Sequence, residues 1–171
     1  MMQYSLVLIK PDAVRRSLMG PVLTKMEETK LKLIAAKLTN VSEALANEHY
    51  AQHVGKPFFA QLMEYITGKL HNAPVVALVY VGENSIQKIR DLAGNTNPEK
   101  ANIDTVRGMF GRITTAGVFE NVLHASANPL EAEREIKLWF EPKEILENIY
   151  PTKKEGLKNV WERIPTAQEV G

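Results

Sequence analysis

The hydrophobic pattern of the first forty residues switches between strand-like and helix-like spacing. Residues 4–9 form a short, almost wholly apolar run, which is typical of a strand buried on both faces. A proline follows, so residues 10–12 are predicted to form a turn. Residues 20–30 carry apolar side chains at helical spacing, with charged residues opposite. Residues 31–39 predict a second strand, with its odd-numbered positions on one face.

Two helices are predicted in the next segment. Ser42 is a suitable N-cap for a helix over 43–53, because its hydroxyl can accept a hydrogen bond from a free N–H of the first turn. Gly55-Lys56-Pro57 interrupts that helix. Apolar positions then recur at helical spacing over 58–67, which predicts the second helix.

The second half of the chain contains the strongest strand signal. Residues 74–81 (PVVALVYV) are continuous, apolar and β-branched. A short helix is predicted over 84–93 and a last strand over 121–124. Between them, 94–119 is rich in turn residues and predicts a long loop, which in a compact domain is usually functional. A final helix is predicted over 129–140, opened by its proline.

Without the extra helices, the predicted order of elements reduces to βαββαβ. That order is typical of a ferredoxin-like α+β sandwich, with one antiparallel sheet and helices packed on one face. We expect this domain to span residues 1–140. Residues 141–171 are polar apart from one amphipathic patch, and we expect them to form a C-terminal extension that packs on the domain or on a neighbouring subunit.

Composition excludes several classes of protein. The 171 residues suit a single domain with or without a tail. Lysine and arginine total 21 against 20 acidic residues, so the net charge of +1 offers no excess for binding nucleic acid or an anionic membrane. The chain has 0 cysteines, which removes disulfides, thiolate ligands and cysteine nucleophiles. No secretory or membrane-spanning segment is apparent, so we expect a soluble cytoplasmic protein.

Among the 4 histidines, His124 is the best candidate for a nucleophile. It ends the last predicted strand, and the small residues that follow it would let a ligand approach the imidazole. On local sequence alone, a structural histidine at a strand end is the more common alternative. His49 and His53 have a spacing that can bind a metal, but no third ligand is evident, so no metal site is predicted. His71 is expected in a surface loop.

A bound nucleotide would have to be held by side chains, because the chain has neither a P-loop nor a G-x-G-x-x-G motif. Lys10, Arg90 and Arg107 are the candidate cations, and together they could bind a polyphosphate. Their spacing does not show that they converge, and taken singly each is more commonly a solvated surface charge. Tyr50, Phe58 and Phe59 are interleaved with Lys56, and aromatic rings near cations can stack on a base. Phe59 continues an apolar helical stripe, so it is better explained as a core residue.

Taken together, these segments resemble the nucleoside diphosphate kinase family. No single motif is decisive, but their combination is highly specific and covers residues 4 to about 140. In family order, the matching segments are 8–14 (LIKPDAV), 49–50 (HY), 56–59 (KPFF), 74–77 (PVVA), 94–98 (GNTNP), 105–108 (TVRG), 121–124 (NVLH), 132–136 (AEREI) and 138–140 (LWF).

The resemblance implies transfer of the γ-phosphate of a nucleoside triphosphate, typically ATP, to a nucleoside diphosphate by a ping-pong mechanism with broad base specificity. It also implies Mg²⁺ carried on the nucleotide phosphates, and a homo-oligomer, hexameric or smaller. His124 would carry the phosphoryl group, Glu135 would orient its ring and Ser126 would support that contact. Phe58 would stack on the base. Phosphates and ribose would be held by Lys10, which would also steady the transferring group, and by Tyr50, Arg90, Thr96, Arg107 and Asn121.

The chain departs from the family pattern in several places. Ala127 replaces the acidic residue that commonly follows the histidine motif, and Met109 interrupts the usual R-G-D-F. Segments 67–74 and 107–121 are longer than the commonest form, and so is the tail. These departures bear on rate, metal handling and oligomer contacts more than on the class of reaction.

Two alternatives follow from the same residues. Ala127 favours a family member that binds nucleotide but has lost most turnover, and that acts as a regulatory or scaffold protein. An RNA-binding ferredoxin-like module would need an aromatic strand motif that the chain lacks. The main prediction is therefore a phosphotransferase that binds neither nucleic acid nor membranes.

Overall fold

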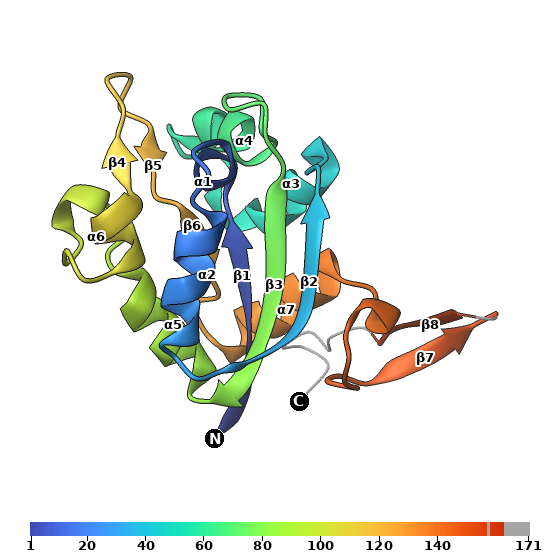
Figure 1. Cartoon of the computed structure of the whole chain (residues 1–171). Coiled ribbons are helices and arrows are strands. Elements are labelled where there is room, and N and C mark those ends of the chain that lie inside the picture. Colours follow the sequence, from blue (N-terminus) through green and yellow to red (C-terminus); the bar gives the residue numbers. More distant parts are fainter. Residues whose placement is uncertain (157, 163–171) are drawn as a thin grey trace.

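A four-stranded antiparallel sheet forms the centre of the protein in the computed structural model, which describes residues 1–156 and 158–162 (Figure 1). The strand order is β2-β3-β1-β6. This is the strand order of the predicted ferredoxin-like α+β fold, and each predicted strand is present. The bounds are β1 Met2–Ile9, β2 Lys32–Thr39, β3 Val75–Glu83 and β6 Leu123–Ala125.

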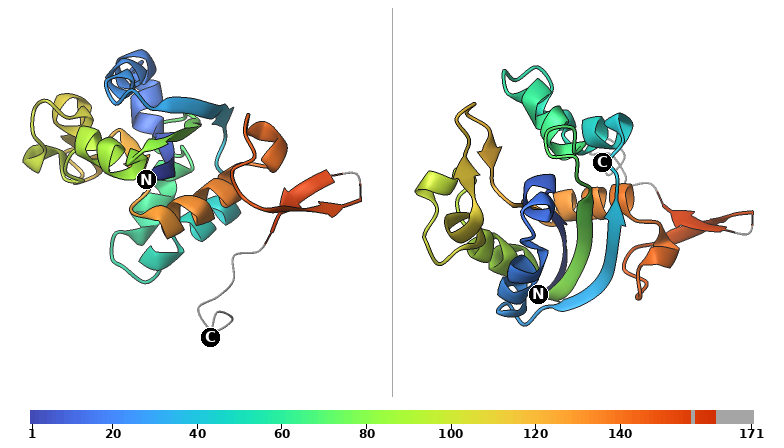
Figure 2. Two further views of the ribbon diagram at one scale, coloured as in Figure 1. Left: turned by 90° about the horizontal axis from the view of Figure 1, so that it is seen from below. Right: turned by 45° about the horizontal axis from the view of Figure 1, so that its top comes forward.

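Helices cover both faces of the sheet, so the prediction of helices on one face is wrong. Leu6 and Leu8 of β1 point into one apolar cluster, whereas Val7 and Ile9 point into another. A strand that is apolar at consecutive positions needs cover on both sides, and Figure 2 shows the sheet between α2 and α7. The first face is covered by α3 (Glu43–His49), α4 (Phe59–Ile66) and α7 (Pro129–Trp139), and the second by α2 (Met19–Glu27), α5 (Ser85–Ala93) and α6 (Val106–Phe110). The short helix η1 (Ala51–His53) lies between α3 and α4 in the chain.

The alternation predicted for 31–39 is wrong because β2 contains a bulge. The register of β2 on β3 shifts between Leu33 and Ala35, which inserts one extra residue. As a result Ile34 is 1% exposed, whereas Leu33 is 38% exposed. Register in an edge strand depends on such tertiary detail, which alternation alone does not reveal.

The segment 94–119 contains regular structure where the sequence predicts a loop. Thr105 caps a helix, because its hydroxyl accepts a hydrogen bond from the N–H of Gly108 at 3.2 Å. A turn predicted at 10–12 is likewise the start of a helix, with Pro11 at its first position. Elements this short give no periodic signal in a sequence. The added elements are α1 (Pro11–Arg15), η2 (Pro98–Lys100), α6, β4 (Arg112–Ile113) and its partner β5 (Phe119–Glu120).

The chain beyond α7 returns to the sheet beside β2. The N–H of Leu146 donates to the carbonyl of Ile34 at 3.1 Å, and Ile145 is buried in the first apolar cluster. Trp161 also packs there, and its indole N–H donates to the carbonyl of Phe140. Here η3 (Pro142–Glu144) precedes a projecting hairpin of β7 (Thr152–Glu155) and β8 (Lys158–Trp161) (Figure 1). The rest of the predicted extension, 157 and 163–171, lies outside the described residues.

None of the helices described in 1–156 and 158–162 is long and apolar enough to cross a membrane.

Candidate active site

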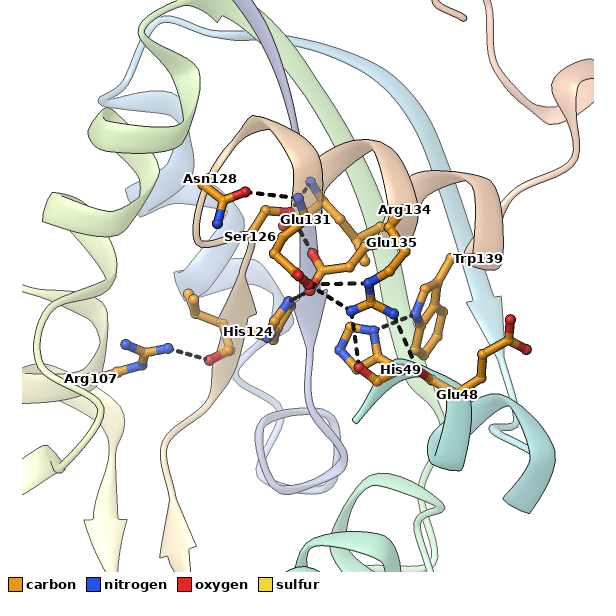
Figure 3. A network of polar contacts seen from close by, with 12 residues as sticks. Glu48, His49, Arg107, His124, Ser126, Asn128, Glu131, Arg134, Glu135 and Trp139 are labelled. Carbon is orange, nitrogen blue, oxygen red and sulfur yellow. Dashed lines mark hydrogen bonds and ion pairs between the residues drawn. The ribbon is translucent and has the colours of Figure 1, made fainter. Parts of the chain in front are cut away.

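The position of His124 follows from the register of a very short strand. His124 on β6 pairs with Leu8 on β1, and paired residues point to the same face of a sheet. Leu8 belongs to the cluster covered by α3 and α7, so the imidazole is directed toward those helices (Figure 3). Its neighbours Leu123 and Ala125 point into the opposite cluster.

A strained turn precedes β6 and brings Asn121 to Lys10. Val122 has a φ of 70°, where β-branched residues rarely lie. The N–H of Leu123 donates to the carbonyl of Asn121 at 2.7 Å, which closes a three-residue turn. The backbone N–H of Lys10 donates to the carbonyl of Val122 at 2.8 Å, and the Lys10 ammonium donates to Asn121 Oδ1 at 2.7 Å. Such strain costs about 1–3 kcal/mol and is common at functional sites.

A chain of hydrogen bonds fixes the His124 ring (Figure 3). His124 Nε2 lies 2.9 Å from Glu135 Oε1, and the Ser126 hydroxyl donates to Glu135 Oε2 at 2.6 Å. Ser126 in turn accepts from the N–H of Leu6 at 3.0 Å. Burial alone would raise the pKa of Glu135, but His124, Ser126 and Arg134 reverse that effect and leave the pKa lowered.

The ionised carboxylate of Glu135 decides the protonation of His124. A carboxylate can only accept hydrogen bonds, so His124 Nε2 must carry the proton. In the neutral ring Nδ1 then has a free lone pair. The arrangement therefore provides an oriented imidazole whose available lone pair lies on Nδ1.

The three candidate cations do converge. Lys10, Arg90 and Arg107 line one cavity of about 970 Å³ together with His124. The Arg107 guanidinium is held by the carbonyls of Gly94 at 2.7 Å and of Leu123 at 2.9 Å. Burial and the neighbouring Arg90 lower the pKa of Arg107 to about 10, so it stays charged at neutral pH. A cavity of this charge is suited to a polyphosphate.

Lys10 is the most perturbed of these cations. It is 6% exposed, and burial, followed by the charge of Arg107, lowers its pKa to about 7, although Asp12 acts in the opposite direction. The ammonium is therefore only partly charged at neutral pH. An anion that bound beside it would favour the protonated form.

The other predicted contact residues line the same cavity, with one exception. Phe58 is 48% exposed, whereas Tyr50 is buried. The side-chain amide of Asn121 donates to the carbonyl of Thr96 at 3.1 Å. Ser126 does not line the cavity and lies behind Glu135. Within the described residues, the hydroxyl of Tyr50 and Nε of Arg107 are buried without a protein partner, and both residues line the cavity, where a polar ligand could pair with them.

Sequence reasoning missed one wall of the cavity. Val118 and Phe119 line it from the hairpin of β4 and β5. No local sequence motif marks these two residues as part of a site. The hairpin is anchored by Glu120, which lies 2.9 Å from Nε2 of His71 and also bonds Arg112. His71 is thus not a surface-loop residue, since its side chain is 12% exposed. The sequence did contain one indication of this wall, since segments 67–74 and 107–121 are both longer than is common in the family. The contact between His71 and Glu120 joins these two segments.

His49 and His53 do not form a metal-binding pair. Helix α3 ends at His49 and Tyr50 leads into η1, so the two rings do not share a helical face. His53 Nδ1 instead lies 3.0 Å from the Lys56 ammonium. Among the described residues, His49, His124 and Glu135 do place ligand atoms within 4.8 Å of one another. This set contains two imidazoles and one carboxylate, Glu135, that is already hydrogen-bonded to His124 and Ser126. It is not the oxygen-rich set of ligands that Mg²⁺ prefers.

Comparisons with known proteins agree with this geometry. The family model described as nucleoside diphosphate kinase matches residues 3–145. The chain is 47% identical to the nucleoside diphosphate kinase of Methanobrevibacter smithii over 145 residues, which cover 85% of this chain and 91% of that protein. It is 43% identical to the Bacillus licheniformis protein of the same name over 160 residues, which cover 94% and 99% of the two chains.

Solved structures give the same result. A transition-state mimic of nucleoside-diphosphate kinase from Borrelia burgdorferi, with bound vanadate and ADP, superposes with a TM-score of 0.77 at 38% identity, covering 85% of this chain and 91% of that one. A halophilic nucleoside diphosphate kinase from Halobacterium salinarum in complex with CDP has a TM-score of 0.77 at 35% identity, covering 86% and 93%.

Proposed function

Because this chain belongs to the nucleoside diphosphate kinase family, we propose that His124 carries the phosphoryl group in the reaction of that family. The reaction is the transfer of the terminal phosphate of a nucleoside triphosphate to a nucleoside diphosphate. One observation carries the assignment of His124. Its Nε2 is bonded to an ionised Glu135, which leaves Nδ1 free in a cavity lined by three cations.

The reaction divides into two half-reactions at one atom. In the first, the lone pair of His124 Nδ1 forms a bond to the γ-phosphorus while the bond from that phosphorus to the β–γ bridging oxygen breaks, and the diphosphate leaves. The proton on Nε2 stays in its hydrogen bond to Glu135, which stabilises the positive charge that develops on the ring. In the second, a different diphosphate takes the phosphoryl group from Nδ1. Because both halves use one cavity, the kinetics are ping-pong.

The cavity supplies charge and base contacts. Lys10, Arg90 and Arg107 offset the negative charge of the phosphates, and Arg107 is already oriented by backbone carbonyls. Phe58 stacks on the base. Stacking reads no base edge, so it accounts for broad base specificity.

A divalent metal is generally used with the nucleotide in this family, and here we propose Mg²⁺. Mg²⁺ is usually bound by one or two carboxylates together with substrate phosphates, and it keeps several waters. The acidic residues that line the cavity are Glu131 and Glu135, and Glu135 is already hydrogen-bonded to His124. The lining therefore does not provide a cluster of carboxylates that could hold the metal without the nucleotide. These residues fit a metal that enters as part of the magnesium–nucleotide substrate and neutralises charge on its phosphates.

The test is to incubate the chain with γ-labelled ATP and Mg²⁺, and then to add GDP. An acid-labile, base-stable label on the protein that passes to GDP is the expected result. Binding of nucleotide without any label would instead favour the regulatory or scaffold alternative, which the relatives do not favour.

Nucleotide binding is expected to take up a proton at Lys10. The pKa of Lys10 is about 7 in the free protein, so at pH 8 it is mostly neutral, and bound phosphates restore its charge. Uptake should approach about one proton near pH 8 and be small below pH 6, so affinity should fall as pH rises above 7. Calorimetric titration with ADP in two buffers of different ionisation enthalpy measures this. Lys10→Met should abolish the uptake, whereas the exposed control Lys88→Met should not.

Restoring the family carboxylate at position 127 is expected to have little effect. Ala127 is exposed at the cavity, so Ala127→Asp should keep the fold and change the transfer rate by no more than about threefold. Ala127→Asn, which has the same size without the charge, is the matched control. A gain of tenfold or more with aspartate alone would mean that the natural site is impaired.

We propose the predicted division of the chain into a catalytic domain, 1–140, and a C-terminal extension, 141–171, that packs on the domain or on a neighbouring subunit. The burial of Ile145 in the first apolar cluster supports this. We also propose a homo-oligomer, hexameric or smaller, because Leu38 on edge strand β2 is 64% exposed. Light scattering after gel filtration tests it. A cytoplasmic location suits the nucleotide substrates.

A further inference from the structure

His49 is a buried histidine that the reaction described above does not use. It lies at the end of α3 and is fully buried. Its ring centroid is 4.6 Å from that of His124, at an interplanar angle of 77°, so the two rings are in edge-to-face contact (Figure 3). The ring therefore touches the nucleophile without touching the open part of the cavity, whose lining does not include His49.

Trp139 decides which nitrogen of His49 carries a proton. The indole Nε1 is only a donor, and it lies 3.1 Å from His49 Nδ1, so Nδ1 must be the acceptor. The proton of the neutral ring is then on Nε2, which is buried without a hydrogen-bond partner among the described residues. Burial, followed by the charges of His124 and Arg134, strongly lowers the pKa of His49. The ring is therefore a neutral Nε2–H tautomer.

The end of α3 is attached to the helix that orients His124. Arg134 of α7 donates to the carbonyl of Glu48 at 3.2 Å and to that of His49 at 3.2 Å, and it also pairs with Glu131 at 2.8 Å. The same helix carries Glu135 and Trp139. This contact between α3 and α7 therefore fixes His49 relative to Trp139, which bonds it, and to Glu135, which bonds His124.

We propose that His49 is a positioning residue, which holds the ring of His124 in the orientation needed for phosphoryl transfer while remaining uncharged. The inference rests on the proposed role of His124. Glu135 holds that ring through Nε2 alone, and a single hydrogen bond leaves the ring able to turn about it. The His49 ring closes one side and prevents that rotation. A cation in the same place would make the lone pair on Nδ1 less basic, whereas a neutral ring does not.

Two variants separate positioning from stability. His49→Gln keeps an acceptor for the Trp139 N–H but removes the ring, whereas His49→Phe keeps a ring but leaves that buried N–H unpaired. Each variant leaves a buried donor unpaired, the Trp139 N–H with Phe and the amide N–H groups with Gln, so both should have a lower thermal midpoint. If the ring positions His124, Gln should be the slower variant, whichever of the two has the lower midpoint. We expect phosphorylation of His124 in a single turnover to fall about tenfold with Gln and less than about threefold with Phe.

The affinity for ADP should change less than about twofold in both variants, since His49 does not line the cavity. A rate in His49→Phe as low as that in His49→Gln, a wild-type rate in His49→Gln, or a rate loss matched by lost affinity would each overturn the proposal.

Imidazole ¹⁵N spectra add a readout that a merely structural role would not move. His124 should give sharp Nε2–H signals in the wild type and in His49→Phe, and broadened or mixed-tautomer signals in His49→Gln. In the wild type, which needs no variant to fold, His49 should remain a neutral Nε2–H tautomer from pH 5 to 9. An Nδ1–H tautomer or a titrating ring would contradict the proposal. A wild type that forms no phosphoenzyme would contradict the role of His124 instead, and leave the His49 spectrum unchanged.

Discussion

Replacing His124 with alanine is expected to abolish labelling of the protein by γ-labelled ATP and to slow phosphate transfer by about four orders of magnitude or more, as is usual when a covalent nucleophile is removed. The cations and Phe58, which are proposed to contact the nucleotide, remain in the cavity, so the dissociation constant for ADP should stay within about threefold of the wild-type value. Rapid-quench labelling and equilibrium binding measure the two effects separately.

The matched control for this substitution is His71→Gln, which also removes an imidazole. Glutamine can still donate to Glu120, and His71 does not line the cavity. Labelling should therefore be retained. Label that persists at the wild-type level in His124→Ala would place the nucleophile on another residue and end the assignment proposed above.

Glu135→Gln is expected to slow phosphorylation of His124 by about 10²-fold or more, because the residue that orients a catalytic histidine controls both its tautomer and its developing charge. The amide is neutral, so it no longer stabilises positive charge on the ring. In one of its two orientations it also donates to His124 Nε2, which moves the proton to Nδ1 and removes the nucleophilic lone pair. Single-turnover labelling gives the rate, and the ¹⁵N spectrum of His124 gives the tautomer.

Glu133→Gln is the control for that change, since Glu133 lies on the same helix but pairs with Lys137 at 2.7 Å and does not line the cavity. Its labelling rate should match that of the wild type. If Glu135→Gln also phosphorylates at the normal rate, the carboxylate is not what orients the ring, and the choice of Nδ1 loses its basis.

The hydrophobic pattern was sufficient for the four strands of the central sheet and for most of the longer helices. The run at 74–81 becomes β3, and Ser42 does cap α3, where its hydroxyl accepts from the N–H of Leu45 at 3.1 Å. Such features depend on neighbours a few residues apart, and local backbone geometry sets those distances. Several elements of five residues or fewer, such as α6 and β4, were not predicted, because segments this short give little periodic signal.

The sequence by itself therefore determined the strand order of a ferredoxin-like domain, the family and the residue types available for chemistry, because these depend on local patterns and on short motifs. Only the tertiary structure decided that Arg90 and Arg107 meet in one cavity, that Nδ1 of His124 is the free nitrogen and that His49 packs against it. Each of these facts is a distance between residues far apart in the chain. Such distances are set by the packing of α3, α5, α6 and α7 on the sheet, and no local spacing records them.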